Sequence, residues 1–194
     1  MNEYRLRLTS PETHFEPFPY FIAMHPLGET ISSTFLRWLE SDAPWKLVET
    51  DFYEQYEFSL LDVLLPPAFQ FFTERPFLED LRRSLEQIFY CHLNQRIDCT
   101  AHKLIRGQRI RIHNDFIPGG ETHRVLIQLN REWQEAQGGV LMLFNSAEAS
   151  DVHRILPPTN DSAVGFAISD KSHHAVSTIH GGERFTLVFS FHNG

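Results

Sequence analysis

The C-terminal half of the chain consists of short strand-like runs separated by turn residues, and this pattern restricts the fold more than any other feature. From about Cys99 onward, runs rich in β-branched and aromatic residues alternate with Gly, Pro, Asn and Asp. The pattern predicts strands over 101–105, 109–113, 125–129, 139–144, 163–168 and 185–191. No helix-length segment recurs between these runs, so a parallel α/β sheet is disfavoured and a β-sandwich or barrel is favoured.

The N-terminal half predicts helices with a few short strands. Strand-like runs over 4–8 and 20–24 are separated by prolines. Apolar residues at helical spacing predict an amphipathic helix over 29–40. A second helix is expected to begin near Pro76, and its apolar stripe continues at helical spacing as far as Leu93.

Residues 45–72 are aromatic and irregular, and two interpretations are open. They form either strand and loop packed beneath the core or a lid over a substrate pocket, a part that long loops near active sites often play. The length of 194 residues fits one domain. We therefore predict a single domain over 1–194, in which 1–98 form a helical and mixed support layer and 99–194 form the β core.

Composition excludes several classes of protein. The formal net charge of −8 argues against a broad nucleic-acid-binding surface. No window of 18 consecutive apolar residues predicts a membrane span, and the first residues do not resemble a secretory signal. The two cysteines, Cys91 and Cys99, match no standard zinc spacing and are expected to be reduced thiols. These features predict a cytoplasmic protein with neither nucleic acid nor membrane as partner.

The residue pattern most indicative of chemistry is the pair His113 and Asp115. In an extended strand, residues at i and i+2 point to the same face. One imidazole and one carboxylate on that face, joined by a distant histidine, form a 2-His-1-carboxylate triad that holds Fe(II) and leaves coordination positions open. His173 and His174 are candidates for the third ligand, and Arg184 follows ten residues after His174.

Several segments resemble, in their order and spacing, those of the Fe(II)- and 2-oxoglutarate-dependent dioxygenases, especially the prolyl-hydroxylase-like branch. The resemblance covers about 100–191 and is carried by 107–115 (GQRIRIHND), 123–133 (HRVLIQLNREW), 138–141 (GGVL), 169–176 (SDKSHHAV) and 182–186 (GERFT). It implies a double-stranded β-helix, a jelly-roll core of the cupin-like kind, with flanking helices. It also implies Fe(II) as cofactor, 2-oxoglutarate and O₂ as co-substrates, and ascorbate as a candidate reductant.

The resemblance implies a role for each residue. His113, Asp115 and His174 would bind the metal, and His174 is preferred to His173 because its offset to Arg184 fits the family. Arg184 would pair with the distal carboxylate of 2-oxoglutarate, since a guanidinium fork matches a carboxylate. Further candidates, each weaker, are Thr186 and Gln128 for the same carboxylate, the latter where relatives often carry tyrosine, and Arg111 for substrate.

The expected reaction is hydroxylation of an unactivated C–H bond in an amino acid, free or within a peptide or protein, with succinate and CO₂ as co-products. Asp115 favours hydroxylation over halogenation, because related halogenases carry a small residue there. One alternative is a tailoring oxygenase for a small natural product. Another is a non-catalytic jelly-roll module that binds a metal or ligand. An open groove beside the iron would indicate a peptide substrate, and a closed pocket lined by aromatics a small molecule.

Overall fold

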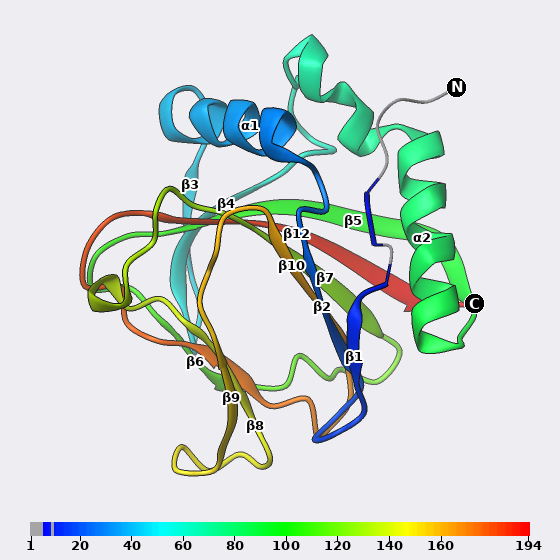
Figure 1. The fold of residues 1–194 in the computed structure, drawn as a ribbon, viewed down its shortest axis with the longest axis vertical. Coiled ribbons are helices and arrows are strands. Elements are labelled where there is room, and N and C mark those ends of the chain that lie inside the picture. The colour runs from blue at the N-terminus through cyan, green and yellow to red at the C-terminus, as the bar shows by residue number, and fades with distance from the viewer. Residues whose placement is uncertain (1–5, 9) are drawn as a thin grey trace.

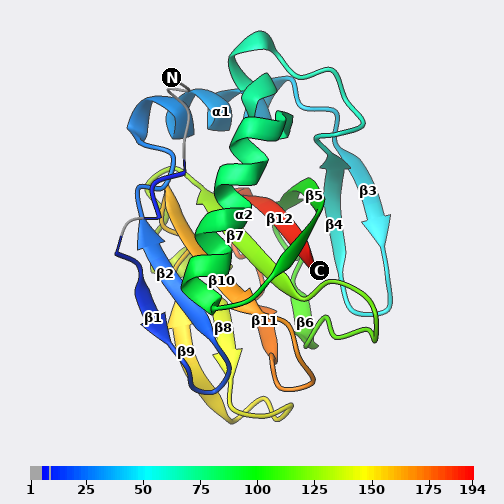
Figure 2. The same cartoon turned by 90° about the vertical axis from the view of Figure 1, so that its right-hand side faces the viewer.

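Two antiparallel sheets form the protein, as seen in a computed structural model that describes residues 6–8 and 10–194 (Figures 1 and 2). The large sheet has eight strands in the order β1-β2-β10-β7-β12-β5-β4-β3, and the small sheet has four in the order β6-β11-β8-β9. In the large sheet the strands are β1 (Glu12–His14), β2 (Tyr20–Met24), β10 (Ser162–Ala167), β7 (His123–Leu129), β12 (Arg184–Asn193), β5 (Leu93–Leu104), β4 (Glu54–Ser59) and β3 (Lys46–Glu49). In the small sheet they are β6 (Ile110–His113), β11 (His174–Val176), β8 (Leu141–Phe144) and β9 (Val152–Leu156).

Strand β12 shows how one sequence serves both faces of the large sheet. Residues 184–192 are all buried, and successive side chains of a strand point to opposite faces. One face presents four apolar side chains to the main core, namely Phe185, Leu187, Phe189 and Phe191. The other face presents Arg184, Thr186, Val188 and Ser190 to a cavity between the two sheets.

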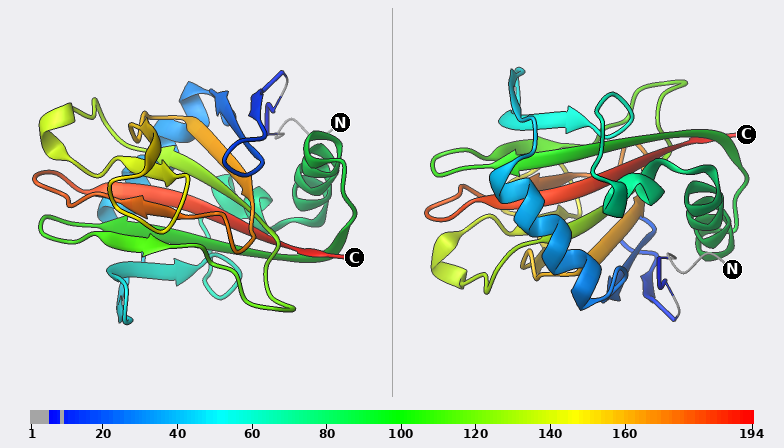
Figure 3. Two further views of the ribbon diagram at one scale, coloured as in Figure 1. Left: turned by 90° about the horizontal axis from the view of Figure 1, so that it is seen from below. Right: turned by 90° about the horizontal axis from the view of Figure 1, so that it is seen from above.

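Helices cover the face of the large sheet that lies away from the small sheet (Figures 1 and 3). They are α1 (Glu29–Ser41), the 3-10 helix η1 (Pro67–Thr73) and α2 (Arg75–Phe89), while a further 3-10 helix, η2 (Glu135–Gln137), follows β7. Phe35 of α1 packs against Phe69 and Phe72 of η1 at ring-centroid distances of 4.9 and 4.8 Å. In the described part of the chain, none of the helices is long and apolar enough to cross a membrane.

The fold class and most predicted elements are confirmed. Helix α1, strand β2 and the six C-terminal strand runs all appear in the structure, although their ends differ by a few residues. The predicted strand over 4–8 lies partly outside the described residues, and 6–8 are not in a strand. Strands β9 and β11, of five and three residues, were not predicted.

The predicted continuation of the second helix to Leu93 is wrong. Tyr90 adopts a left-handed conformation with φ 54°, which ends α2 at Phe89. Leu93 begins β5, which extends to Leu104 and therefore starts well before the predicted residue 101. Leu93 and Ile97 are both buried as residues of strand β5. The helical spacing between Leu93 and the apolar residues before it is therefore coincidental. Because β5 runs across residues 98 and 99, the predicted division at that point falls within one continuous strand.

Residues 45–72 supply both strand and aromatic packing. β3 and β4 form a hairpin that extends the large sheet beyond β5. Trp45 and Phe58 pack edge to face beside the core, with ring centroids 4.9 Å apart. Phe52, in the turn of the hairpin, lies 4.8 Å from the ring of His113. Packing beneath the core is therefore observed, and the turn of this segment reaches the predicted metal site.

Candidate active site

Two predicted metal ligands face each other across the small sheet. His113 is the last residue of β6 and His174 is the first of β11, and the antiparallel register pairs them directly. Their ring centroids are 4.2 Å apart. Strand pairing thus brings together two histidines that are far apart in the sequence, and His174 rather than His173 lies opposite His113.

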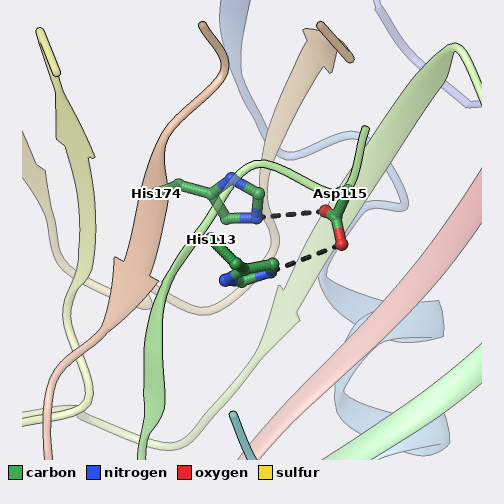
Figure 4. A group of neighbouring side chains, drawn as sticks. All are labelled: His113, Asp115 and His174. Atoms are coloured by element: carbon green, nitrogen blue, oxygen red, sulfur yellow. Dashed lines mark ion pairs between the residues drawn. The ribbon is translucent and has the colours of Figure 1, made fainter. Parts of the chain in front are cut away.

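Asp115 reaches the two histidines by a different route from the predicted one. It lies beyond the end of β6, and its φ of 58° is in the left-handed region that few residues other than Gly adopt. Its Oδ1 lies 3.4 Å from His113 Nε2 and its Oδ2 lies 3.2 Å from His174 Nε2 (Figure 4). The pair was expected on one extended strand, but a turn brings the carboxylate to the imidazoles.

The spacing of these three side chains suits a metal ion. Their candidate ligand atoms all lie within 4.8 Å of one another. Neighbouring ligands that are each about 2.1 Å from an octahedral ion lie about 3 Å apart, which is close to the observed distances. All three residues also line the cavity, so an ion that they held would be accessible from it.

Backbone carbonyls orient both imidazoles. His113 Nδ1 lies 2.8 Å from the carbonyl oxygen of Arg111, and His174 Nδ1 lies 2.8 Å from that of Ser172. A ring that donates Nδ1–H in this way keeps the Nε2 lone pair free for a metal. Burial lowers the pKa of His174, which favours the neutral form that a ligand requires.

Arg184 lies in the same cavity and has no acidic partner among the described residues. Its side chain is 3% exposed, and Nη1 donates a 2.9 Å hydrogen bond to Thr186 Oγ1, which in turn lies 3.1 Å from Gln128 Oε1. Its Nε and Nη2 are buried without a hydrogen-bond acceptor. Burial lowers the pKa of Arg184 to about 10. Two donors of a buried cation are therefore free to bind an anion.

Gly139 leaves room for Arg184. This residue has a φ of 66°, and a Cβ atom built there would lie 2.5 Å from Ile179 Cδ1 and 3.2 Å from Arg184 Cδ. A side chain at this position would therefore displace the arginine as well as strain the backbone.

Arg111, the predicted substrate residue, lies outside this cavity. Its side chain is exposed and donates a 3.4 Å hydrogen bond to the carbonyl oxygen of Asp51. The prediction assumed regular alternation along β6, but the register with β11 shifts between His113 and Ile110, so that three residues of β6 span two of β11. Ile110 and His113 consequently both face the cavity, and Arg111 does not.

Several polar and charged cavity residues escaped prediction, among them Arg124 and His102. Arg124 of β7 contacts Asp115, and His102 of β5 lies in register between Thr186 and Glu57 of the neighbouring strands. Burial, with a smaller effect of Arg124 and Arg184, lowers the pKa of His102 to about 3, so the imidazole is neutral. The alternation of side chains along β5 and β7 could have indicated that His102 and Arg124 face the cavity. That inference requires knowing that these two strands lie on either side of β12.

Comparison with known proteins agrees with this geometry. The sequence profile of the 2OG-Fe(II) oxygenase superfamily matches residues 99–192. No curated protein sequence matches the chain.

The structure resembles several solved prolyl hydroxylases at identities that support the fold alone. A Pseudomonas putida prolyl-4-hydroxylase is 20% identical, with a TM-score of 0.74 over 90% of this chain and 92% of that one. A Trichoplax adhaerens prolyl hydroxylase, solved with a peptide of hypoxia inducible factor, is 15% identical, with a TM-score of 0.67 over 90% and 83%. The profile match to residues 99–192, the shared jelly-roll-like fold and the His-Asp-His cluster together make the chain similar to the 2OG-Fe(II) oxygenase superfamily.

Proposed function

We propose that this protein is an Fe(II)- and 2-oxoglutarate-dependent hydroxylase that acts on an unactivated C–H bond of an amino-acid residue. The observation that carries the proposal is the unpaired guanidinium of Arg184 in the same cavity as His113, Asp115 and His174. A buried cation with free donors is costly unless an anion binds there. A metal triad and an anion receptor in one cavity fit a metal-chelating dicarboxylate.

In this proposal His113, Asp115 and His174 hold Fe(II). Two neutral imidazoles and one carboxylate are the donor set that suits a ferrous ion and leaves positions for other ligands. When bound, iron with 2-oxoglutarate and O₂ supplies the oxidising power, and succinate and CO₂ are the co-products. Two features keep Asp115 ionised for this role. Burial raises its pKa, but contacts with the two imidazoles and the charge of Arg124 outweigh that effect and lower it well below its usual range.

Arg184 would hold the distal carboxylate of 2-oxoglutarate through Nε and Nη2, which form a planar fork that matches two carboxylate oxygens. Thr186 fixes the third nitrogen of that guanidinium, and Gln128 accepts from Thr186, so the three side chains form one ordered unit. The cavity volume of about 260 Å³ suits a small molecule of this kind.

The substrate in this proposal is a residue within a peptide or protein. A second hollow of about 650 Å³ lies at the mouth of the metal site and is open to solvent. Its lining includes His113 and Asp115 together with two aromatic side chains, Phe52 and Phe116. An open groove beside the metal site favours a peptide substrate over a small molecule enclosed in a pocket. Similarity to prolyl hydroxylases suggests proline as the first residue to test.

The test is an anaerobic titration of the protein with Fe(II) and 2-oxoglutarate. A bidentate chelate on such a triad gives a weak charge-transfer band at about 500 nm. The band should survive in His173→Ala and disappear in His174→Ala, since only His174 lies beside Asp115. Absence of the band in the wild-type protein, with iron shown not to bind, would reject the proposal in favour of a non-catalytic module.

A further inference from the structure

A partly buried ion-pair chain lies directly behind the proposed metal ligand Asp115. Arg124 Nη1 donates to Asp115 Oδ2 at 2.5 Å, and Arg124 Nη2 donates to Glu121. The Arg124 side chain is 19% exposed and those of Asp115 and Glu121 are 11% and 30% exposed. One guanidinium therefore connects the metal-ligand carboxylate to a second carboxylate.

The backbone around Asp115 does not by itself fix that carboxylate. Asp115 lies in a left-handed turn, and the segment that follows it to Glu121 includes Gly119 and Gly120 and has few hydrogen bonds. Neighbouring Asn114 is held, since its carbonyl oxygen accepts from Ser172 Oγ and its Nδ2 donates to the carbonyl oxygen of Asp170. For the Asp115 side chain, Arg124 is the only hydrogen-bond donor among the described residues, and the two imidazoles lie within 3.4 Å of its oxygens.

The two oxygens of Asp115 have different surroundings. Oδ2 accepts from Arg124 and lies near His174, whereas Oδ1 lies near His113. A donor that occupies one carboxylate oxygen leaves the other as the stronger candidate for a metal. A carboxylate that binds through one oxygen also uses one coordination position rather than two.

We propose that Arg124, itself held by Glu121, is a positioning residue that keeps Asp115 a ligand through a single oxygen. This inference rests on the proposed function, because it assigns Asp115 to the metal. The ion-pair chain fixes the carboxylate in its left-handed turn and preserves the positions that 2-oxoglutarate and O₂ need. Arg124 touches neither of them in this assignment and acts through Asp115.

The experiment measures Mn(II) affinity by calorimetry and the absorption spectrum of the Co(II)-substituted protein, both without 2-oxoglutarate. Arg124→Gln should weaken Mn(II) binding by about 10–100-fold, the usual effect of removing a partner that orients a metal ligand. Its Co(II) spectrum should change in intensity, since a freed Asp115 alters the coordination number. Arg124→Lys, which keeps the charge but replaces the fork with a single ammonium group, should restore part of the affinity.

Glu121→Gln keeps Arg124 in place and weakens its support, so a smaller loss of Mn(II) affinity is expected. It also serves as the test if Arg124→Gln does not fold. The matched control is Glu40→Gln, which removes the carboxylate of an exposed pair with Arg131 far from the metal ligands and should leave both readouts unchanged.

Two results would contradict the inference in different ways. In the first, the wild-type protein binds Mn(II), and Arg124→Gln and Glu121→Gln bind it at least as tightly and keep the wild-type Co(II) spectrum. Arg124 then does not position Asp115. If the wild-type protein binds neither ion, the proposed function itself fails and this inference fails with it.

Discussion

Two buried arginines on adjacent strands face the same cavity and differ in their partners. Within the described residues Arg184 of β12 has no carboxylate beside it, and burial lowers its pKa to about 10. Burial also disfavours the charge of Arg124 on β7, but Asp115 and Glu121 outweigh that effect and raise its pKa. The comparison teaches that a guanidinium in this cavity can serve two purposes: in our proposals the paired Arg124 positions Asp115, and the unpaired Arg184 binds an anion.

The sharpest test of this contrast is the stability of the metal-free protein. Removing one partner of a buried ion pair costs about 3–5 kcal/mol, and the partial exposure of Arg124 reduces our expectation for Arg124→Met to about 3 kcal/mol. Arg184→Met should leave stability unchanged or raise it, since it removes an unpaired buried charge. Urea unfolding measures both.

The exposed pair of Arg131 with Glu40 gives the control for those stability measurements. Arg131→Met should cost less than about 1 kcal/mol. Equal losses of stability in Arg124→Met and Arg184→Met would show that pairing is not what distinguishes the two arginines.

The next effect concerns co-substrate affinity. Arg184→Met should weaken 2-oxoglutarate binding to the Mn(II)-loaded protein by about 30-fold or more, because truncating one partner of a buried charge pair costs about 2 kcal/mol or more. Arg184→Lys should give an intermediate loss, since it keeps the charge without the fork. Calorimetric titration measures each affinity, and Arg111→Met, which alters an exposed arginine outside the cavity, should match the wild type. An undiminished affinity in Arg184→Met would place the carboxylate elsewhere.

A more gradual effect is expected in the pH dependence of stability, through His102 on β5, the strand next to that of Arg184. Its pKa is lowered to about 3 in the folded protein from an ordinary value of 6.5, so between these values the unfolded chain binds the extra proton. Stability is then lost as the pH falls below 6.5, by at most about 1.4 kcal/mol per pH unit from this residue. The advantage of the wild type over His102→Gln in free energy of unfolding should therefore shrink from pH 6.5 to pH 4. A constant difference across that range would show that His102 does not titrate as inferred.

The smallest effect uses His102 as a reporter of the two arginine charges. Burial contributes most to its lowered pKa, and Arg124 and Arg184 contribute less. Arg184→Met should therefore raise the pKa of His102, by less than about 1, and NMR titration of the histidine would detect the change. A pKa equal to that of the wild type would mean that water screens Arg184 from His102, and that the arginine is less buried than the structure indicates.

Local patterning predicted much of the fold. Helix α1 and strands such as β2 and β12 follow from the spacing of apolar residues, because one face of each must be buried. The predicted metal ligands lie together, as expected from their spacing and the family resemblance. Their assignment to iron, that of Arg184, Thr186 and Gln128 to 2-oxoglutarate, and the single domain over 1–194 stay predictions.

The sequence by itself determined which residue types were available and the period at which they recur. This sufficed to predict the β-rich core and, with the family resemblance, to nominate His113, Asp115, His174 and Arg184 for one site. Tertiary structure alone decided the left-handed turn at Asp115, the shifted register of β6 that turns Arg111 outward, and the partners of Arg124. These features depend on which strands pair and in what register. Strand pairing joins residues distant in the sequence. Local periodicity restricts the register of a pair, but it does not tell which strands become neighbours or where a register shifts.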